Sequence, residues 1–117
     1  MRMMVAAALV LMASGALADE IGDAHRLALQ GRDSYWNCLA REYSRDGTKG
    51  MSAKDFTADI QSVCPSERQN FRVALIDYLS MQDPDADSSN HLSTANRAIE
   101  LAQQDIITAF VKHKAAN

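Results

Sequence analysis

Cys38 and Cys64 are the two residues of this 117-residue chain whose chemistry is easiest to anticipate, and they are its whole cysteine content. An even count favours a disulfide in an oxidising compartment. The closed loop would hold 27 residues, from 38 to 64 inclusive, which corresponds to about 3.5 kcal/mol of stability if loop-closure entropy is the cause. A metal–thiolate pair or a catalytic dithiol is the alternative. Both need a Cys-x-x-Cys or a nearby histidine, which the sequence lacks. We therefore predict a structural disulfide.

Three aspartates alternate along a second segment that could bind a cation. Asp83, Asp85 and Asp87 have the spacing of the first three ligands of an EF-hand loop. The glycine, apolar residue and bidentate glutamate required at positions 6, 8 and 12 are replaced by Ser88, Asn90 and Thr94. We predict a solvated acidic loop, with weak divalent-cation association as the alternative and no tightly bound metal.

The remaining chemistry-bearing residues do not form a catalytic pattern. His25, His91 and His113 are far apart and share no helical i, i+3 or i+4 spacing, so they do not predict a metal site. No Gly-x-Ser-x-Gly elbow occurs, and carboxylates such as Glu42 and Asp46 are interpreted as exposed helix charges. We expect a protein that is not an enzyme and that needs no cofactor.

An aromatic group surrounds the first cysteine. On a helix, Tyr35 shares the inward face with Cys38, while Trp36 points about 100° away, towards Tyr43 seven residues on. Packing against the disulfide is one interpretation. The other is a partner-binding patch of Trp36, Tyr43 and Arg32, in which the Arg32 guanidinium stacks on the indole.

The N-terminal segment has the three parts of a secretory signal in order. Arg2 supplies a positive charge, residues 5–12 are apolar without interruption, and residues 16–18 read Ala-Leu-Ala before Asp19. The apolar run is too short for a transmembrane helix. A lipoprotein would need cysteine where Asp19 stands. We expect cleavage after residue 18 and a periplasmic or secreted bacterial protein.

Removal of residues 1–18 leaves residues 19–117, 99 residues that make a single domain. A domain of this size gains appreciably from a crosslink. The chain has 12 basic and 15 acidic residues, and loss of Arg2 gives 11 − 15 = −4. Without a basic cluster, this charge argues against nucleic acid and anionic membranes as partners.

Apolar residues recur every three or four positions, and no strand pattern or internal repeat is visible. We expect helices at about 20–45, 52–64, 65–81 and 90–114. Short connections then predict an all-α, antiparallel bundle of about four helices closed by one disulfide. The inward faces are expected to include Leu27 and Leu92.

Several residues sharpen this expectation. Ser52 is placed to cap the second helix by accepting from the amide of Asp55. Gly31 lies on an inward face, where it indicates either a close helix crossing or a break. The two cysteines are at unequal distances from the turn at 46–50, so the helices must cross, or Cys64 must lie in a turn that swings back.

A short motif adds a resemblance. It resembles small exported bacterial proteins with paired cysteines on helices and no assigned activity, through Tyr35-x2-Cys38 followed by Cys64-x2-Glu67-x3-Phe71-Arg72. The resemblance covers roughly residues 34–74 and implies export and a helical fold. A looser similarity to secreted helical lysozyme-inhibitor-like domains implies an inhibitor of an envelope-acting hydrolase, although their second cysteine pair is absent here.

Three functions remain open from these observations. The first is a module that binds a periplasmic or envelope protein through an exposed apolar face. Self-association through Leu101 and Ile107 on the last helix is a variant of it. The second is a protein that binds a small ligand or a divalent cation between its helices or at the acidic loop. The third is the hydrolase inhibitor.

Overall fold

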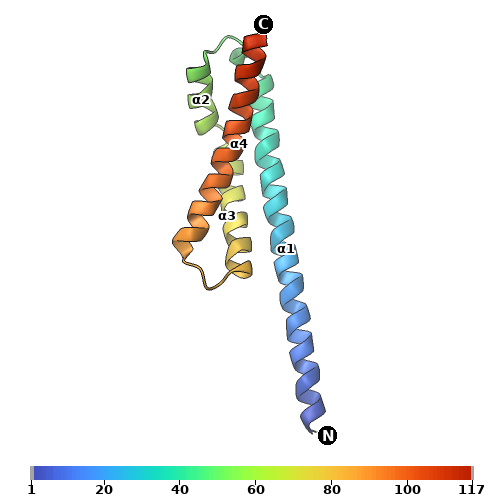
Figure 1. Cartoon of the computed structure of the whole chain (residues 1–117). Helices are drawn as coiled ribbons and strands as arrows, with labels where there is room; N and C mark the ends of the chain where they lie inside the picture. The colour runs from blue at the N-terminus through green and yellow to red at the C-terminus, as the bar shows by residue number, and fades with distance from the viewer. Residues whose placement is uncertain (1, 117) are drawn as a thin grey trace.

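The computed structural model describes the backbone of residues 2–116 and the side chains of residues 17–116. Within this part the chain is almost wholly helical and has no strand, which confirms the predicted all-α bundle with one disulfide. Figure 1 shows the elements in order: α1 (Arg2–Ser44), the short 3₁₀ helix η1 (Asp46–Thr48), α2 (Ala53–Ser62), α3 (Pro65–Gln82) and α4 (Ser88–Ala116). The predicted signal segment, residues 1–18, falls mostly on positions whose side chains lie outside the described residues.

The helices make three arms rather than four parallel rods. α2 and α3 follow one another as a broken arm, and α1 and α4 are the two long arms beside it (Figure 1). α1 packs chiefly on α3, whereas α2 packs chiefly on α4. Because the chain breaks between α2 and α3, α2 can pack on α4 while α3 packs on α1.

The pairing of α1 with α3 has a constant antiparallel register. In three successive contacts along the two helices, the residue numbers of each pair add to 102 or 103: His25 with Tyr78, Gly31 with Phe71, and Cys38 with Cys64. Such a constant sum is what two antiparallel helices of equal rise produce. The disulfide therefore lies in register with the packing of the rest of the pair.

Gly31 marks a close approach of these two helices. A Cβ added at this position would lie 3.0 Å from the Cα of Phe71, which is backbone and cannot swing aside. α1 continues through Gly31 without interruption. The close crossing expected at this glycine is thus confirmed, and the alternative of a helix break is wrong.

The core lies where all three arms meet. Its fully buried members are Tyr35 and Leu39 from α1 with Phe56 and Ile60 from α2. α4 contributes a strip at helical spacing: Ile99, Ala102, Ile106 and Phe110. This strip matches the periodicity predicted for the last helix, because a 3.6-residue period keeps one face inward.

Two leucines expected to face inward do not. Leu27 is 52% exposed, because Ala24 and Ala28 occupy the inward face of α1. Leu92 is also exposed, and His91 is buried in its place. The ring Nε2 of His91 lies 3.0 Å from the carbonyl oxygen of Asp83, and Leu92, the next residue along the helix, is exposed.

The end of the first helix agrees with the prediction, but α1 begins at Arg2 rather than near residue 20. The hydroxyl of Ser52 accepts a hydrogen bond from the amide of Asp55 at 3.1 Å, which confirms the N-cap of α2. α2 ends at Ser62, earlier than expected. α4 begins at Ser88, also earlier, and the Asp87 carbonyl accepts from two amides of its first turn.

Candidate functional site

The predicted disulfide is present, although its two cysteines lie at unequal distances from the turn at residues 46–50. Cys38 in α1 is joined to Cys64 in the connection between α2 and α3, with 6.1 Å between their Cα atoms. Cys64 has a left-handed backbone, with φ of 58° and ψ of 47°. That conformation swings the chain back towards α1 and starts α3 at Pro65, so the turn makes up the unequal distances.

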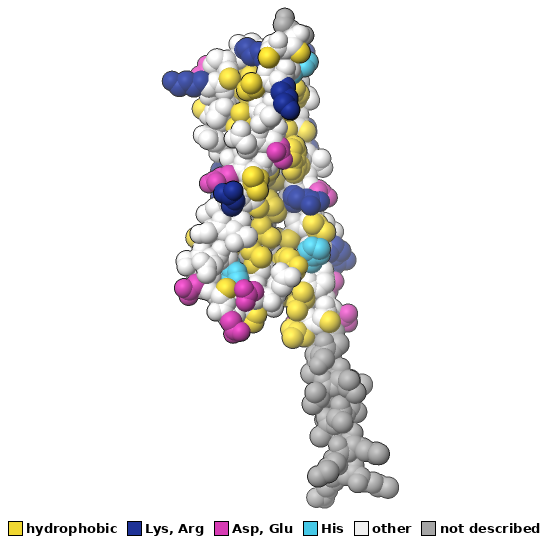
Figure 2. Space-filling model, viewed as in Figure 1, with side chains coloured by type: hydrophobic (Ala, Val, Ile, Leu, Met, Phe, Trp, Pro, Cys, Tyr) yellow, Lys and Arg dark blue, Asp and Glu magenta, His cyan; other side chains and the backbone are white. Residues whose placement is uncertain are grey.

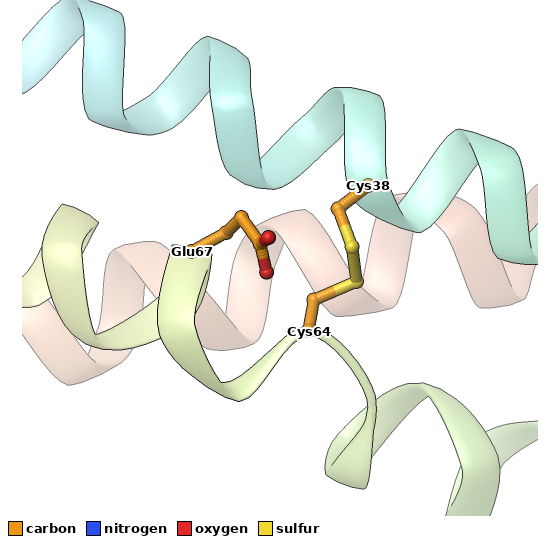
Figure 3. Close-up of side chains that lie close together, drawn as sticks. All are labelled: Cys38, Cys64 and Glu67. Carbon is orange, nitrogen blue, oxygen red and sulfur yellow. A yellow bond between two sulfur atoms is a disulfide. The ribbon is translucent and has the colours of Figure 1, made fainter.

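A carboxylate points at the disulfide. Glu67 in the first turn of α3 is directed towards the two sulfur atoms (Figure 3), and the carboxylate oxygen and both sulfurs lie within 4.8 Å of one another. A nearby negative charge disfavours a thiolate. Bonded sulfurs also offer no thiolate to a metal ion. This environment suits a structural crosslink better than a reactive dithiol or a metal centre.

The aromatic residues singled out from the sequence pack partly on the core. Trp36 is half-buried against it. Tyr43 is also half-buried, with its ring edge-on to Phe56 and Phe110 at centroid distances of 6.3 and 6.5 Å. Arg32 is exposed, and its guanidinium pairs with the neighbouring aspartate at 3.1 Å. The use of Trp36, Tyr43 and Arg32 by a partner stays a prediction.

The acidic loop lies between α3 and α4. Asp83, Asp85 and Asp87 are all exposed there, and the carbonyl oxygen of Asp83 is engaged by His91. Among the described residues, the one group of convergent metal-ligating side chains is that at the disulfide. Weak cation binding by the three aspartates stays a prediction.

A pair of carboxyl groups joins α1 to α2, which the sequence did not suggest. Glu42 is half-buried rather than an exposed helix charge, and it pairs with Arg45 at 2.8 Å. Hydrogen bonding from Arg45 lowers the pKa of Glu42. Burial, and then the neighbouring carboxyl of Glu42, raise the pKa of Asp59, whose Oδ2 is buried without a hydrogen-bond partner. Glu42 therefore keeps its negative charge more readily than Asp59 does.

A groove of about 440 Å³ with exposed apolar side chains lies between α1 and α3. We call it the α1–α3 groove. Its apolar side chains are Ala24, Leu27, Val73, Ala74 and Met81, and its polar border is Glu20, Asp23, Asn70 and Asp77. Leu27, which was expected to face inward, is about half exposed here, and so are Val73 and Met81.

Acidic residues gather around this groove. Glu20, Asp23 and Asp77 border it, and the acidic loop follows α3 directly after Met81. Figure 2 shows hydrophobic side chains along the junction of the helices and acidic side chains around the end of the bundle where α3 turns into α4. Asp23 pairs with Arg26 at 3.3 Å, but both side chains are mostly exposed, and such pairs contribute little.

Comparisons with known proteins give no relative. No protein family matches the chain, and no curated protein or solved structure matches it significantly. The exported two-cysteine proteins suggested by the motif at residues 34–74 therefore stay a resemblance, although the helical body and the disulfide it implies are present.

Fold and crosslink together define a small helical bundle closed by one disulfide. Such a crosslink fits an extracellular or periplasmic protein. Within the described part of the chain, no helix has both the length and the apolar content needed to cross a bilayer.

Proposed function

We propose that this protein is an interaction module, acting by binding rather than catalysis, whose α1–α3 groove takes up a basic amphipathic helix of a partner protein. The observation that carries the proposal is an open apolar groove bordered by carboxylates. Leu27, Val73 and Met81 expose apolar surface that a partner would remove from water.

The shape of the groove favours a helix as its occupant. Two antiparallel helices form its walls, and an amphipathic helix laid between them adds a third member to the packing. On α3 the groove extends from Asn70 to Met81, which is about 16 Å at the helical rise per residue. That length matches about three turns of a partner helix.

Charge decides which kind of helix fits. Glu20 and Asp23 on α1 face the groove from one side, and Asp77 on α3 from the other. The acidic loop adds further negative charge beyond Met81. A partner with leucine-like residues on one face and lysine or arginine along its flanks satisfies both the apolar floor and the acidic border.

Synthetic peptides test the proposal without a known partner. Three fluorescein-labelled peptides of about 18 residues are compared: an amphipathic Leu/Lys helix, a Leu/Glu helix with the same leucine pattern, and a shuffled Leu/Lys sequence. Fluorescence anisotropy should show saturable binding of the first alone, weakening as salt is raised. Equal binding of the shuffled peptide would reduce the effect to unspecific charge attraction and would overturn the proposal.

Two leucine variants locate the binding surface. Leu27→Ser lies in the groove, and Leu101→Ser lies on α4 away from it; the two side chains are 52% and 54% exposed. Loss of one leucine from the interface should weaken peptide binding about tenfold, whereas Leu101→Ser should leave it unchanged. Equal effects of the two variants would contradict the assignment to the groove.

The binding module is proposed to work in the periplasm or outside the cell. The signal pattern of residues 1–18 and the disulfide support this location. Expression of the full-length chain in a bacterium should give a fractionated periplasmic or secreted protein that begins at Asp19 by intact-mass measurement. Substitution of Ala18 by Phe should retain the longer form. An unprocessed wild-type chain in the cytoplasmic fraction would refute the location.

A further inference from the structure

A second hollow lies at the opposite end of the bundle, where α1 ends, η1 follows, and the last turns of α4 pack beside them. Its volume is about 500 Å³, within the range of small-molecule sites. Tyr43 and Phe110 form its apolar part, and Lys49, His113 and Lys114 bring nitrogen-bearing side chains to it. We call it the terminal pocket.

The aromatic floor of the terminal pocket is held in place from behind. Phe110 is buried and stacks on Phe56, with ring centroids 3.9 Å apart and planes 10° apart. Tyr43 meets the ring of Phe110 edge-on. Since both rings are fixed by their neighbours, the floor exists before any ligand binds, and little conformational entropy is lost on binding.

Thr48 fixes the wall that η1 contributes. Its side chain is fully buried, and its hydroxyl lies 3.0 Å from the carbonyl oxygen of Tyr43 and 2.7 Å from that of Arg45. These contacts engage carbonyl groups at the end of α1, where the helix dipole is negative. The hydroxyl of Thr48 thus ties η1 to the end of α1 and holds this wall of the pocket in place.

Positive charge lies above the floor. Lys114 Nζ is 5.6 Å from the centre of the Phe110 ring and hydrogen-bonds to the carbonyl oxygen of Met51. Lys49 makes an ion pair with Asp46 at 3.6 Å, in which both side chains are highly exposed. Such a pair is weak enough for a competing anion to take over the ammonium group.

From this arrangement we propose that the terminal pocket binds a small apolar carboxylate. Its hydrocarbon part, a fused ring or a short alkyl chain, rests on Phe110 and Tyr43. Its carboxylate lies between the ammonium groups of Lys49 and Lys114. A bare inorganic anion would leave the aromatic floor exposed to water, and a neutral hydrocarbon would make no charge-assisted contact with Lys49 or Lys114. The site therefore selects molecules that have both an apolar part and a negative charge.

Titration calorimetry with 2-naphthoate and decanoate tests the site on the full chain. At least one of them should bind saturably with one molecule per chain, and the two results show whether a ring or an alkyl chain is preferred. Neutral 2-naphthamide and decanamide, which keep the hydrocarbon and lack the charge, should bind at least tenfold more weakly. Equal binding of acid and amide, or no saturable binding of either acid at millimolar concentration, would overturn the proposal.

Lysine variants separate the site from general charge attraction. Lys49→Met and Lys114→Met should each raise the dissociation constant of the acid about tenfold, as loss of one charge-assisted contact does. Lys112→Met removes the same charge from the same helix as Lys114, at a residue that does not line the pocket. It should bind like the wild type, and an equal loss there would refute the site. Thermal melting of each variant verifies that it is folded.

Discussion

The side-chain amide of Gln103 in α4 donates a 3.0 Å hydrogen bond to the hydroxyl of Tyr35 in α1, and both side chains are buried. The two residues are 68 positions apart. The apolar side chains around these two residues offer no other partner, so this bond is satisfied only when α1 and α4 take one rotation relative to one another. It therefore contributes to a unique packing as well as to stability.

Loss of this hydroxyl should be costly. Tyr35→Phe leaves the amide of Gln103 buried without its partner, which should lower the free energy of unfolding by about 1–3 kcal/mol. The double variant Tyr35→Phe with Gln103→Leu removes both polar groups and should recover most of this loss. Urea unfolding measures all three proteins. A neutral single variant would mean that water satisfies the amide.

The close contact of α1 with α3 at Gly31 can be tested with two glycines of the same helix. Gly31→Ala should destabilise the protein, because overpacking against the Phe71 backbone costs about 1–3 kcal/mol and exceeds the roughly 1 kcal/mol gained in helix propensity. Gly22→Ala places its Cβ where nothing lies within 4 Å and should stabilise α1 instead. Opposite shifts in melting temperature are expected, and shifts of the same sign would argue against the close crossing.

The disulfide between Cys38 and Cys64 should carry a large share of the stability. Replacing both cysteines by serine frees the 27-residue loop in the unfolded chain and should lower the free energy of unfolding by about 3.5 kcal/mol. Chemical reduction of the wild-type protein should give the same midpoint in urea. If the serine variant were as stable as the oxidised protein, the crosslink would not be structural.

The carboxyl pair between α1 and α2 should make stability depend on pH. Because the pKa of Asp59 is raised in the folded protein, the folded state binds this proton more tightly than the unfolded state. The stabilisation that comes from binding this proton is complete below pH 3.8, the ordinary pKa of the carboxyl group. It is lost as the pH rises through the pKa that Asp59 has in the folded protein.

Asp59→Asn keeps an uncharged side chain at every pH. The variant should therefore be more stable than the wild type near neutral pH, and the difference should shrink as the pH is lowered towards 3.8. The contribution of Glu42, whose pKa is lowered chiefly by hydrogen bonding from Arg45, runs in the opposite sense. Melting temperatures across this range measure the difference, and Asp105→Asn, at an exposed position, is the control. A constant difference at all pH values would exclude Asp59 as its source.

Much of the fold could be predicted because the signals are local. The Ser52 cap and the period of α4 depend on residues within one or two turns of each other. The cysteine pairing followed from counting, since two cysteines allow one intramolecular bond. These inferences needed no knowledge of which helix lies beside which.

The proposed binding surfaces could not be predicted in the same way. The α1–α3 groove joins Leu27 to Val73, and the terminal pocket joins Tyr43 to Phe110. Periodicity alone marked Leu27 as inward, because it shares the apolar arc of α1 with Ala24. The position of the neighbouring helix decides which part of an apolar arc is covered. The periodicity of apolar residues along a single helix does not contain that information.

By itself, the sequence determined the helical class, the crosslink and the approximate helix boundaries, since hydrogen bonding along a helix and the capping of its ends are interactions between near neighbours. Only the tertiary structure decided the left-handed turn at Cys64, the burial of His91 in place of Leu92 and the coupling of Glu42 to Asp59. Each of these depends on contacts between segments that the chain brings together only when its arms pack, because desolvation and steric fit act through space and not along the sequence.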